Sequence, residues 1–229
     1  MPARKKEPKD LTAKKNLALE VIDRLKKEYP DAGCTLDYDH AWQLLVSVRL
    51  AAQCTDARVN IVVEDLFARY PSVAALAAAE PEDIEAIVKP CGLGHSKARD
   101  ISACMRMLRD KYNCQVPTTF EELLALPGVG RKSANLIMGD VFGKPAIVTD
   151  THCIRLCNKI GLVDGIKEPQ KVEMALWKII PPEEGSDLCH RFVMHGRAVC
   201  NARKPECEKC CLNDICRYAR EQSGADTAQ

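Results

Sequence analysis

The chain has 229 residues, of which 46% are hydrophobic, enough for one large or two small domains with buried cores. Its 33 lysines and arginines nearly balance 32 aspartates and glutamates, so the net charge neither requires nor excludes a polyanionic partner. No stretch reaches the roughly 20 apolar residues that a membrane span needs, so we expect no membrane-spanning helix.

The N-terminal segment, MPARKKEPKDLTAKKN, is basic but has no apolar run after it, so we expect no secretory signal. The protein is therefore expected inside the cell, where thirteen cysteines, an odd number, argue against a disulfide framework. Metal ligation and ordinary packing remain for the thiols. We expect residues 1–10 and the polar end, SGADTAQ, to be mobile.

Alanine- and leucine-rich stretches recur at helical spacing, whereas few segments alternate with a period of two, so we predict an all-α protein. Most prolines fall between the helical runs, where they can end a helix without breaking one. The predicted helices cover residues 12–28, 39–52, 56–69, 72–78, 82–88, 95–111, 119–124, 131–141, 151–160, 168–178 and 185–197.

Residues 126–135, LPGVGRKSAN, place a turn between two predicted helices. Gly128 and Gly130 allow backbone conformations closed to other residues, and the next helix N-terminus favours an anion such as phosphate. Arg131 and Lys132 put cations where acidic residues are normally preferred, which indicates a functional site. The positive helix end, with partial burial, favours a neutral lysine amine able to attack carbon. A plain helix-turn-helix corner is the alternative.

Asp150, in IVTDTHCIRLCNKIG, directly precedes a predicted helix. A carboxylate at this place is most simply a helix N-cap, which would explain the residue completely. The same carboxylate can also face a cleft, so both roles stay open. We assign no catalytic role to His152, which is typical of a packed helix residue.

The segment CNARKPECEKCCLNDIC carries four cysteines with the spacing C-x6-C-x2-C-x5-C, namely Cys200, Cys207, Cys210 and Cys216. Soft thiolates suit zinc as well as an iron-sulfur cluster, so the ligand chemistry alone does not choose between them. Cys211 receives no role, because adjacent residues cannot readily both ligate. We expect the other cysteines to be small buried hydrophobes: Cys34, Cys54, Cys91, Cys104, Cys114, Cys153, Cys157 and Cys189.

LPGVGRKSAN resembles the helix-hairpin-helix element of the DNA glycosylase superfamily, with lysine at the position that marks its bifunctional glycosylase/lyase members. Asp150 lies eighteen residues beyond Lys132, which matches the family's second catalytic position. The cysteine spacing resembles the 4Fe-4S loop of the endonuclease III family. The resemblance thus implies Lys132 and Asp150 as catalytic residues, and a 4Fe-4S cluster bound by Cys200, Cys207, Cys210 and Cys216.

The same resemblance assigns residues to DNA contacts. Arg203 and Lys204, in NARKPE, lie where the family's cluster loop meets the DNA backbone. Gln53, in LAAQCTDARVN, matches a glutamine that fills the gap left by an extruded nucleotide, and Leu93, in CGLGHSKARD, matches its companion wedge. The hairpin residues Gly128, Gly130 and Arg131 complete the expected interface.

The related adenine glycosylases share the cysteine loop but have a catalytic glutamate where this chain has Ser47 and Val48. They also lack the lysine and carry a further C-terminal domain, whereas this chain ends thirteen residues after Cys216. Two other classes stay open: a non-catalytic DNA-binding module and a zinc-stabilised structural protein. The pair of Lys132 and Asp150 weighs against both, because neither class needs it.

The resemblance covers roughly Leu17 to Cys216 and implies a two-domain fold: a six-helix barrel over 34–144 with the hairpin, and an iron-sulfur domain from 1–33 and 145–229. It also implies excision of oxidised pyrimidines from duplex DNA, with β-elimination at abasic sites through a lysine Schiff base. We expect a monomer with no membrane partner. The expected compartment is the cytoplasm, at the nucleoid, for a bacterial protein; nucleus or mitochondrion stays open.

Overall fold

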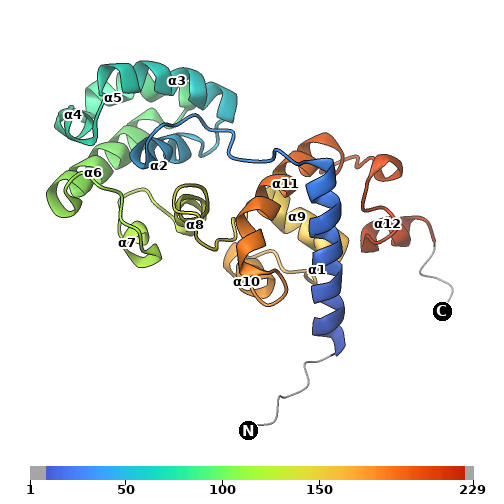
Figure 1. Cartoon of the computed structure of the whole chain (residues 1–229). Coiled ribbons are helices and arrows are strands. Elements are labelled where there is room, and N and C mark those ends of the chain that lie inside the picture. Colours follow the sequence, from blue (N-terminus) through green and yellow to red (C-terminus); the bar gives the residue numbers. More distant parts are fainter. Residues whose placement is uncertain (1–8, 225–229) are drawn as a thin grey trace, which may run out of the picture. The chain divides into compact units, whose positions relative to one another are not determined.

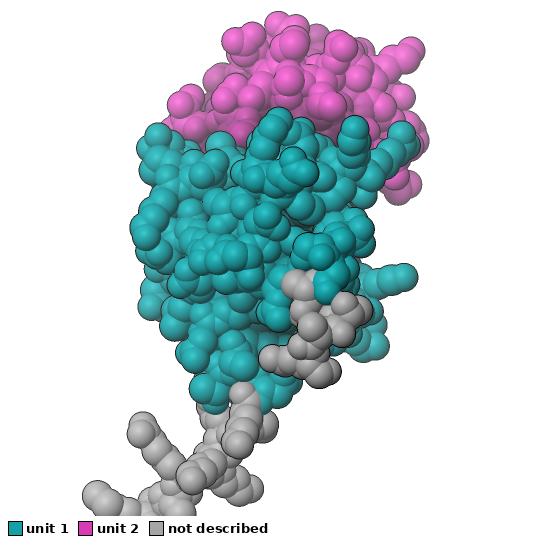
Figure 2. All heavy atoms as spheres, turned by 90° about the vertical axis from the view of Figure 1, so that its right-hand side faces the viewer, with its two compact units in different colours: residues 1–33, 145–229 teal, residues 34–144 magenta. Residues whose placement is uncertain are grey.

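The computed structural model describes residues 9–224, so residues 1–8 and 225–229 of the two ends expected to be mobile lie outside the described residues, whereas residues 9 and 10 belong to a helix. Every regular element between residues 9 and 224 is a helix, which confirms the all-α prediction. No helix of this part is long and apolar enough to cross a membrane. The chain divides into two compact units, residues 34–144 (unit 2) and residues 1–33 with 145–229 (unit 1) (Figure 2).

Unit 2 is built around its longest helix, α6 (Gly94–Tyr112), which packs against α4 and α5 (Figure 1). The buried residues of α6 recur three or four positions apart, at Ala98, Ile101, Met105 and Leu108, and so form one apolar face. The other helices of the unit are α2 (Ala41–Leu50), α3 (Asp56–Arg69), α4 (Val73–Ala78), α5 (Pro81–Val88), the 3-10 turn η1 (Lys89–Cys91), α7 (Phe120–Leu124) and α8 (Arg131–Asp140).

Unit 1 joins segments far apart in the chain. Its N-terminal helix α1 (Lys9–Glu28) packs against α11 (Gly185–Ala198) through a stripe of buried residues that includes Val21 and Leu25, and α11 also packs against α9 (Thr151–Ile160). The remaining helices are α10 (Pro169–Leu176), α12 (Arg217–Gln222) and the 3-10 turns η2 (Pro182–Glu184) and η3 (Cys207–Lys209).

The predicted helices are all present, with ends that differ from the prediction by three residues or fewer. Pro81 begins α5 instead of separating two helices, because a proline at the first helical position gives up only an amide that has no intrahelical acceptor. The prediction missed α12, because Ala219 is the one buried residue of its sequence RYAREQ and no apolar face marks the helix.

The hairpin joins α7 to α8 through a tight turn that rests on an ion pair. Beneath the turn, a guanidinium nitrogen of Arg49 in α2 lies 2.7 Å from a carboxylate oxygen of Asp100 in α6. Gly128 has a φ of +75°, and a Cβ there would lie only 2.9 Å from the Cβ of Asp100. The backbone therefore needs glycine at this position for both its conformation and its close approach to α6.

Gly130 differs from the expectation. Its φ of −96° and ψ of 176° are open to any residue, and a Cβ there would meet no atom of the described residues within 4 Å. The prediction that both glycines adopt restricted conformations is therefore wrong for Gly130. Its missing side chain leaves open space at the N-terminus of α8, which is the place where a ligand could approach.

We expect Gly128→Ala to lower the free energy of unfolding by about 2–4 kcal/mol, since a left-handed alanine is strained and its methyl group overlaps Asp100. Gly130→Ala is the matched control and should change stability by about 0.5 kcal/mol or less. Denaturant unfolding of both variants checks the prediction. Equal losses for the two variants would show that the turn does not depend on the close contact at Gly128.

Candidate active site and nucleic-acid interface

Lys132 is the second residue of α8, and its side chain is exposed. The first turn of α8 holds no acidic residue, and its N-cap, Gly130, has no side chain to cap the amides. A lysine and the helix amides thus share one positive end, the arrangement that binds a phosphate. The partial burial expected for this lysine is not seen, so exclusion of water around its amine would have to come from a bound ligand.

Arg131 has a contact inside the hairpin. Its guanidinium lies 4.9 Å from the centre of the Phe120 ring, close enough for a cation–π interaction. The side chain is half-buried and ties the start of α8 to the start of α7. The DNA contact predicted for Arg131 stays a prediction, beside this structural role.

Asp150 caps α9, as the simpler of the two sequence interpretations requires. Its Oδ1 accepts a hydrogen bond of 2.7 Å from the amide of Cys153, and its carbonyl accepts one from the amide of Ile154. Within residues 9–224, the second carboxylate oxygen has no hydrogen-bond partner. The half-buried carboxylate therefore combines a fixed orientation with one oxygen left for another ligand.

Three buried thiols lie behind this cap, although their contact was not predicted from the sequence. Cys153 Sγ lies 3.9 Å from Cys157 Sγ, and Cys189 Sγ accepts the amide of Val148 at 3.2 Å. Hydrogen bonding among the thiols, together with burial, raises the pKa of Cys153 and of Cys189 well above the usual value. The wall behind Asp150 is therefore uncharged at neutral pH, and it does not repel the carboxylate.

Lys132 belongs to unit 2 and Asp150 to unit 1, and the structure describes each residue within its own unit. Unit 2 also carries the hairpin, Gln53 and Leu93. Unit 1 carries the cysteine loop with Arg203 and Lys204.

The four predicted cluster ligands lie on one loop that runs from the end of α11 to the start of α12. Cys207 begins η3 and Cys216 is the N-cap residue of α12. Burial raises the pKa of Cys200 and of Cys216, whereas hydrogen bonding with Cys211, followed by burial, raises that of Cys210 to about 12. Cys211 itself has its pKa lowered by this bond, which is the only sign that distinguishes it from the four.

Among the described residues, no three side chains of His, Cys, Asp or Glu are close enough together to hold a metal ion. The donor set nevertheless fits a 4Fe-4S cluster, which is wider than a single ion and holds its cysteine sulfurs farther apart. Cys210 and Cys216 both raise the pKa of Cys200, so the thiols are near enough to influence one another, and Lys159 and Arg155 lower it. Those two cations would offset the negative charge of four thiolates.

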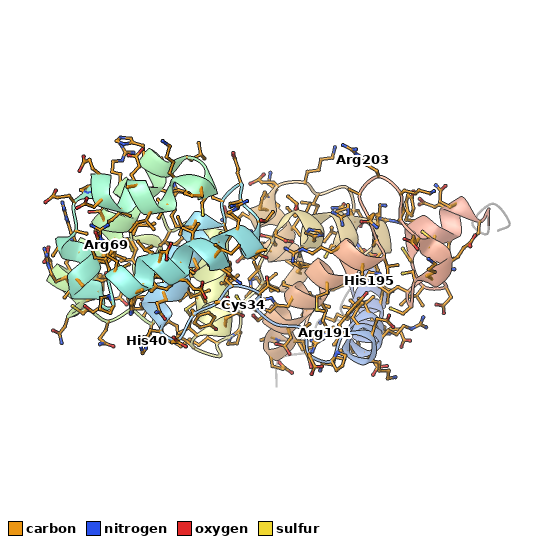
Figure 3. The ribbon with its side chains drawn as sticks, turned by 90° about the horizontal axis from the view of Figure 1, so that it is seen from above. Cys34, His40, Arg69, Arg191, His195 and Arg203 are labelled. Atoms are coloured by element: carbon orange, nitrogen blue, oxygen red, sulfur yellow. The ribbon has the colours of Figure 1, made fainter. Side chains whose placement is uncertain are left out.

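Two residues that the sequence interpretation did not select fix this loop. His195 of α11 is buried and lies between Tyr29, whose hydroxyl is 3.1 Å from Nδ1, and Cys210, whose sulfur is 3.3 Å from Nε2 (Figure 3). Arg155 of α9 donates a 2.9 Å hydrogen bond to the carbonyl of Cys200. His195 lies five residues before Cys200 in VMHGRAVC, but that position alone carried no chemical signal.

Arg203 and Lys204 are exposed on the stretch between the first two cysteines, and Figure 3 shows Arg203 on the outside of the unit. The amide of Glu206 donates to the carbonyl of Val199 at 3.0 Å and closes this stretch into a short loop. Two cations therefore project from a loop whose ends are fixed. Their contact with a phosphate backbone stays a prediction.

Gln53 and Leu93 share a feature that sequence reasoning did not foresee. Both residues have left-handed backbones, with φ of 56° and 52°, and both side chains are exposed. Such a conformation costs a residue other than glycine about 1–2 kcal/mol and is concentrated at functional sites. Leu93 is 57% exposed, so its side chain is accessible to a ligand.

Known proteins similar to this chain are DNA repair enzymes. Residues 46–182 match the family model of the HhH-GPD superfamily base excision DNA repair proteins. The endonuclease III of Synechocystis sp. is 43% identical over 92% of this chain and 96% of its own length. The endonuclease III of Escherichia coli K12 is 38% identical over 87% of this chain and 94% of its own.

Solved structures give the same result. An endonuclease III in a non-covalent complex with DNA has a TM-score of 0.86, 40% identity and coverage of 92% of this chain and 98% of its own. A thermostable thymine-DNA glycosylase, at 22% identity and a TM-score of 0.80, supports the fold alone. From the hairpin, the cysteine loop and these matches together, we conclude that the chain belongs to the endonuclease III family of DNA glycosylases and abasic-site lyases, within the HhH-GPD superfamily of base excision DNA repair proteins.

Proposed function

We propose that this protein is a bifunctional DNA glycosylase and abasic-site lyase that removes oxidised pyrimidines from duplex DNA. The observation that carries the proposal is Lys132, an exposed amine on an acid-free helix N-terminus at the tip of a glycine hairpin. A module that only held phosphate would need the cation and the amides, but it would not need the capped carboxylate of Asp150.

In this mechanism the hairpin amides and the exposed pair Arg203 and Lys204 hold the DNA backbone through phosphate contacts. Extrusion of the damaged nucleotide costs roughly a few kcal/mol, and insertion of Gln53 and Leu93 into the gap offsets part of that cost. Bound DNA excludes water from around Lys132.

The neutral amine of Lys132 then attacks the sugar C1′ and displaces the base. The carboxylate of Asp150 stabilises the positive charge that develops on the sugar and assists proton transfer. The sugar ring then opens at the C1′–O4′ bond, O4′ takes up a proton, and the nitrogen of Lys132 becomes the Schiff base at C1′. Loss of a proton from C2′ breaks the C3′–O bond, so the 3′ phosphate leaves by β-elimination and the strand is cleaved. In support, a relative with 40% identity and a TM-score of 0.86 was solved as a trapped covalent intermediate of endonuclease III with DNA.

A 4Fe-4S cluster, when bound by Cys200, Cys207, Cys210 and Cys216, would hold the loop of Arg203 and Lys204 rigid and take no part in base removal. The adenine glycosylase alternative is disfavoured because Ser47 and Val48, where that family has its glutamate, offer no carboxylate, and Ser47 is fully buried inside unit 2. We further propose that the protein acts as a monomer on duplex DNA with damaged pyrimidines or abasic sites, in the cytoplasm at the nucleoid if the source is bacterial.

We expect Lys132→Gln to abolish covalent trapping by borohydride on duplex DNA that contains one thymine glycol, since no amine remains to form the Schiff base. A denaturing gel measures the trapped complex. Lys111→Gln, which removes an exposed lysine at the end of α6 in the same unit, is the control and should trap normally. Trapping by the Lys132 variant would refute the assigned nucleophile.

Asp150 can be tested because asparagine caps a helix as well as aspartate does. Asp150→Asn should keep the hydrogen bond to Cys153 and the stability, yet slow base release about a hundredfold because the negative charge is lost. Asp150→Ala should lose about 1 kcal/mol of stability as well. Single-turnover base release and thermal unfolding measure the two effects. Normal base release by the asparagine variant would leave the cap as the sole role.

The adjacent cysteines provide a matched test of the cluster. Cys210→Ser should lose the brown colour and the iron of the purified protein, because it removes one of four thiolate ligands. Cys211→Ser changes the same kind of side chain one residue away and should keep both. Iron per chain and visible absorbance measure the outcome. A colourless wild-type protein with one zinc per chain would replace the cluster with a structural zinc site.

A further inference from the structure

Lys97 of α6 is one of the largest fully buried side chains of the described residues, and it has a defined polar environment. Its Nζ donates hydrogen bonds of 2.8 Å to the carbonyl of Leu50 and of 2.8 Å to the carbonyl of Cys91. Lysine is almost never fully buried without partners, and burial lowers its pKa here. Both acceptors are backbone carbonyls, so the ammonium joins two stretches of main chain.

Each of the two carbonyls belongs to the end of a helical segment. Leu50 is the last residue of α2, and Cys91 is the last residue of η1. Carbonyls at such ends lack intrahelical donors, and a cation there is favoured by the helix dipole. The buried ammonium therefore caps both segments at once and brings their ends to one point.

The chain that leaves each end carries one of the two residues assigned to the DNA gap. Gln53 follows Leu50 by three residues, and Leu93 follows Cys91 by two. The amide of Lys97 also donates a 3.0 Å hydrogen bond to the carbonyl of Leu93, the N-cap of α6, so the lysine contacts Leu93 itself as well as the chain just before it. The exposed side chains of Gln53 and Leu93 thus project from two turns that one buried residue connects.

We infer that Lys97 is a positioning residue for base extrusion: its ammonium fixes the spacing between the turns of Gln53 and Leu93, so that both side chains can enter one gap in the DNA. The two left-handed backbones fit this role, since strained residues keep their conformation only where the surroundings hold them. The inference rests on the proposed function, because it assumes that Gln53 and Leu93 enter DNA.

The alternative is a purely structural role, in which the aliphatic stem of the lysine only fills the core. Lys97→Met separates the two interpretations, because methionine keeps an unbranched apolar stem and removes all three donors. Lys97→Arg restores donors and charge. Leu108→Ala, a buried change farther along α6, is the control for a general loss of stability in unit 2.

The experiment uses duplex DNA with a tetrahydrofuran analogue of an abasic site, which the lyase cannot cleave, opposite a fluorescent adenine analogue that brightens when it is unstacked. We expect Lys97→Met to lose about tenfold in preference for this duplex over intact duplex and most of the brightening, since two buried acceptors lose their donor. Affinity for intact duplex should not change. Lys97→Arg should recover part of the loss, and Leu108→Ala should show none.

Two results would overturn the inference: a normal preference and brightening in Lys97→Met, or an equal loss in Leu108→Ala at the same melting temperature. If Lys97→Met fails to fold, Lys97→Gln takes its place, and amide hydrogen exchange in residues 51–54 and 92–94 must rise together in that variant. Gln53→Ala and Leu93→Ala distinguish a failure of the inference about Lys97 from a failure of the proposed function. If neither affects brightening by an otherwise active enzyme, the insertion step is wrong and the inference fails with it; if the wild type neither prefers nor cleaves damaged DNA, the proposed function fails.

Discussion

The buried apolar face of α6 is the contact on which unit 2 depends. Its periodic residues give α4 and α5 a surface to pack on, and polar residues beside that face hold particular turns and helix ends. Asp100, with Arg49, supports the Gly128 turn, and Lys97 holds the ends of α2 and η1. The hairpin, Gln53 and Leu93 are therefore all positioned by one helix, so their arrangement is as rigid as the packing of α6.

In unit 1, α11 has the corresponding role. Cys189 on this helix lies in the thiol group behind Asp150, and His195, less than two turns later, contacts the sulfur of Cys210. The carboxylate and the cysteine loop thus share a support. This arrangement explains how residues that perform no chemistry can still determine the orientation of those proposed to do so.

The helices could be predicted because each buries a periodic face, and the hairpin because glycine, proline and basic residues mark it directly. Lys132, Asp150 and the cysteines came from motif and spacing, and their roles stay predictions. The left-handed turns at Gln53 and Leu93 could not be foreseen, because neither residue type prefers that conformation and tertiary contacts impose it. For the same reason Lys97 looked like any helical lysine: its two carbonyl partners are brought to it by the packing of α2 and η1 and not by helical spacing. At Gly130 the prediction was wrong in the other direction. The glycine suggested a restricted backbone conformation, but its φ and ψ are open to any residue.

The interrupted sequence of unit 1 has a consequence for synthesis of the chain. The helix α1 leaves the ribosome first, but its partner α11 begins more than 150 residues later, because Glu28 ends one helix and Gly185 starts the other. At about 5–20 residues per second, that delay is on the order of 10–30 s. Unit 2 is continuous and can fold within this interval. Meanwhile the stripe around Val21 and Leu25 lacks its α11 partner, so a nascent chain exposes it to chaperones until α11 has been synthesised.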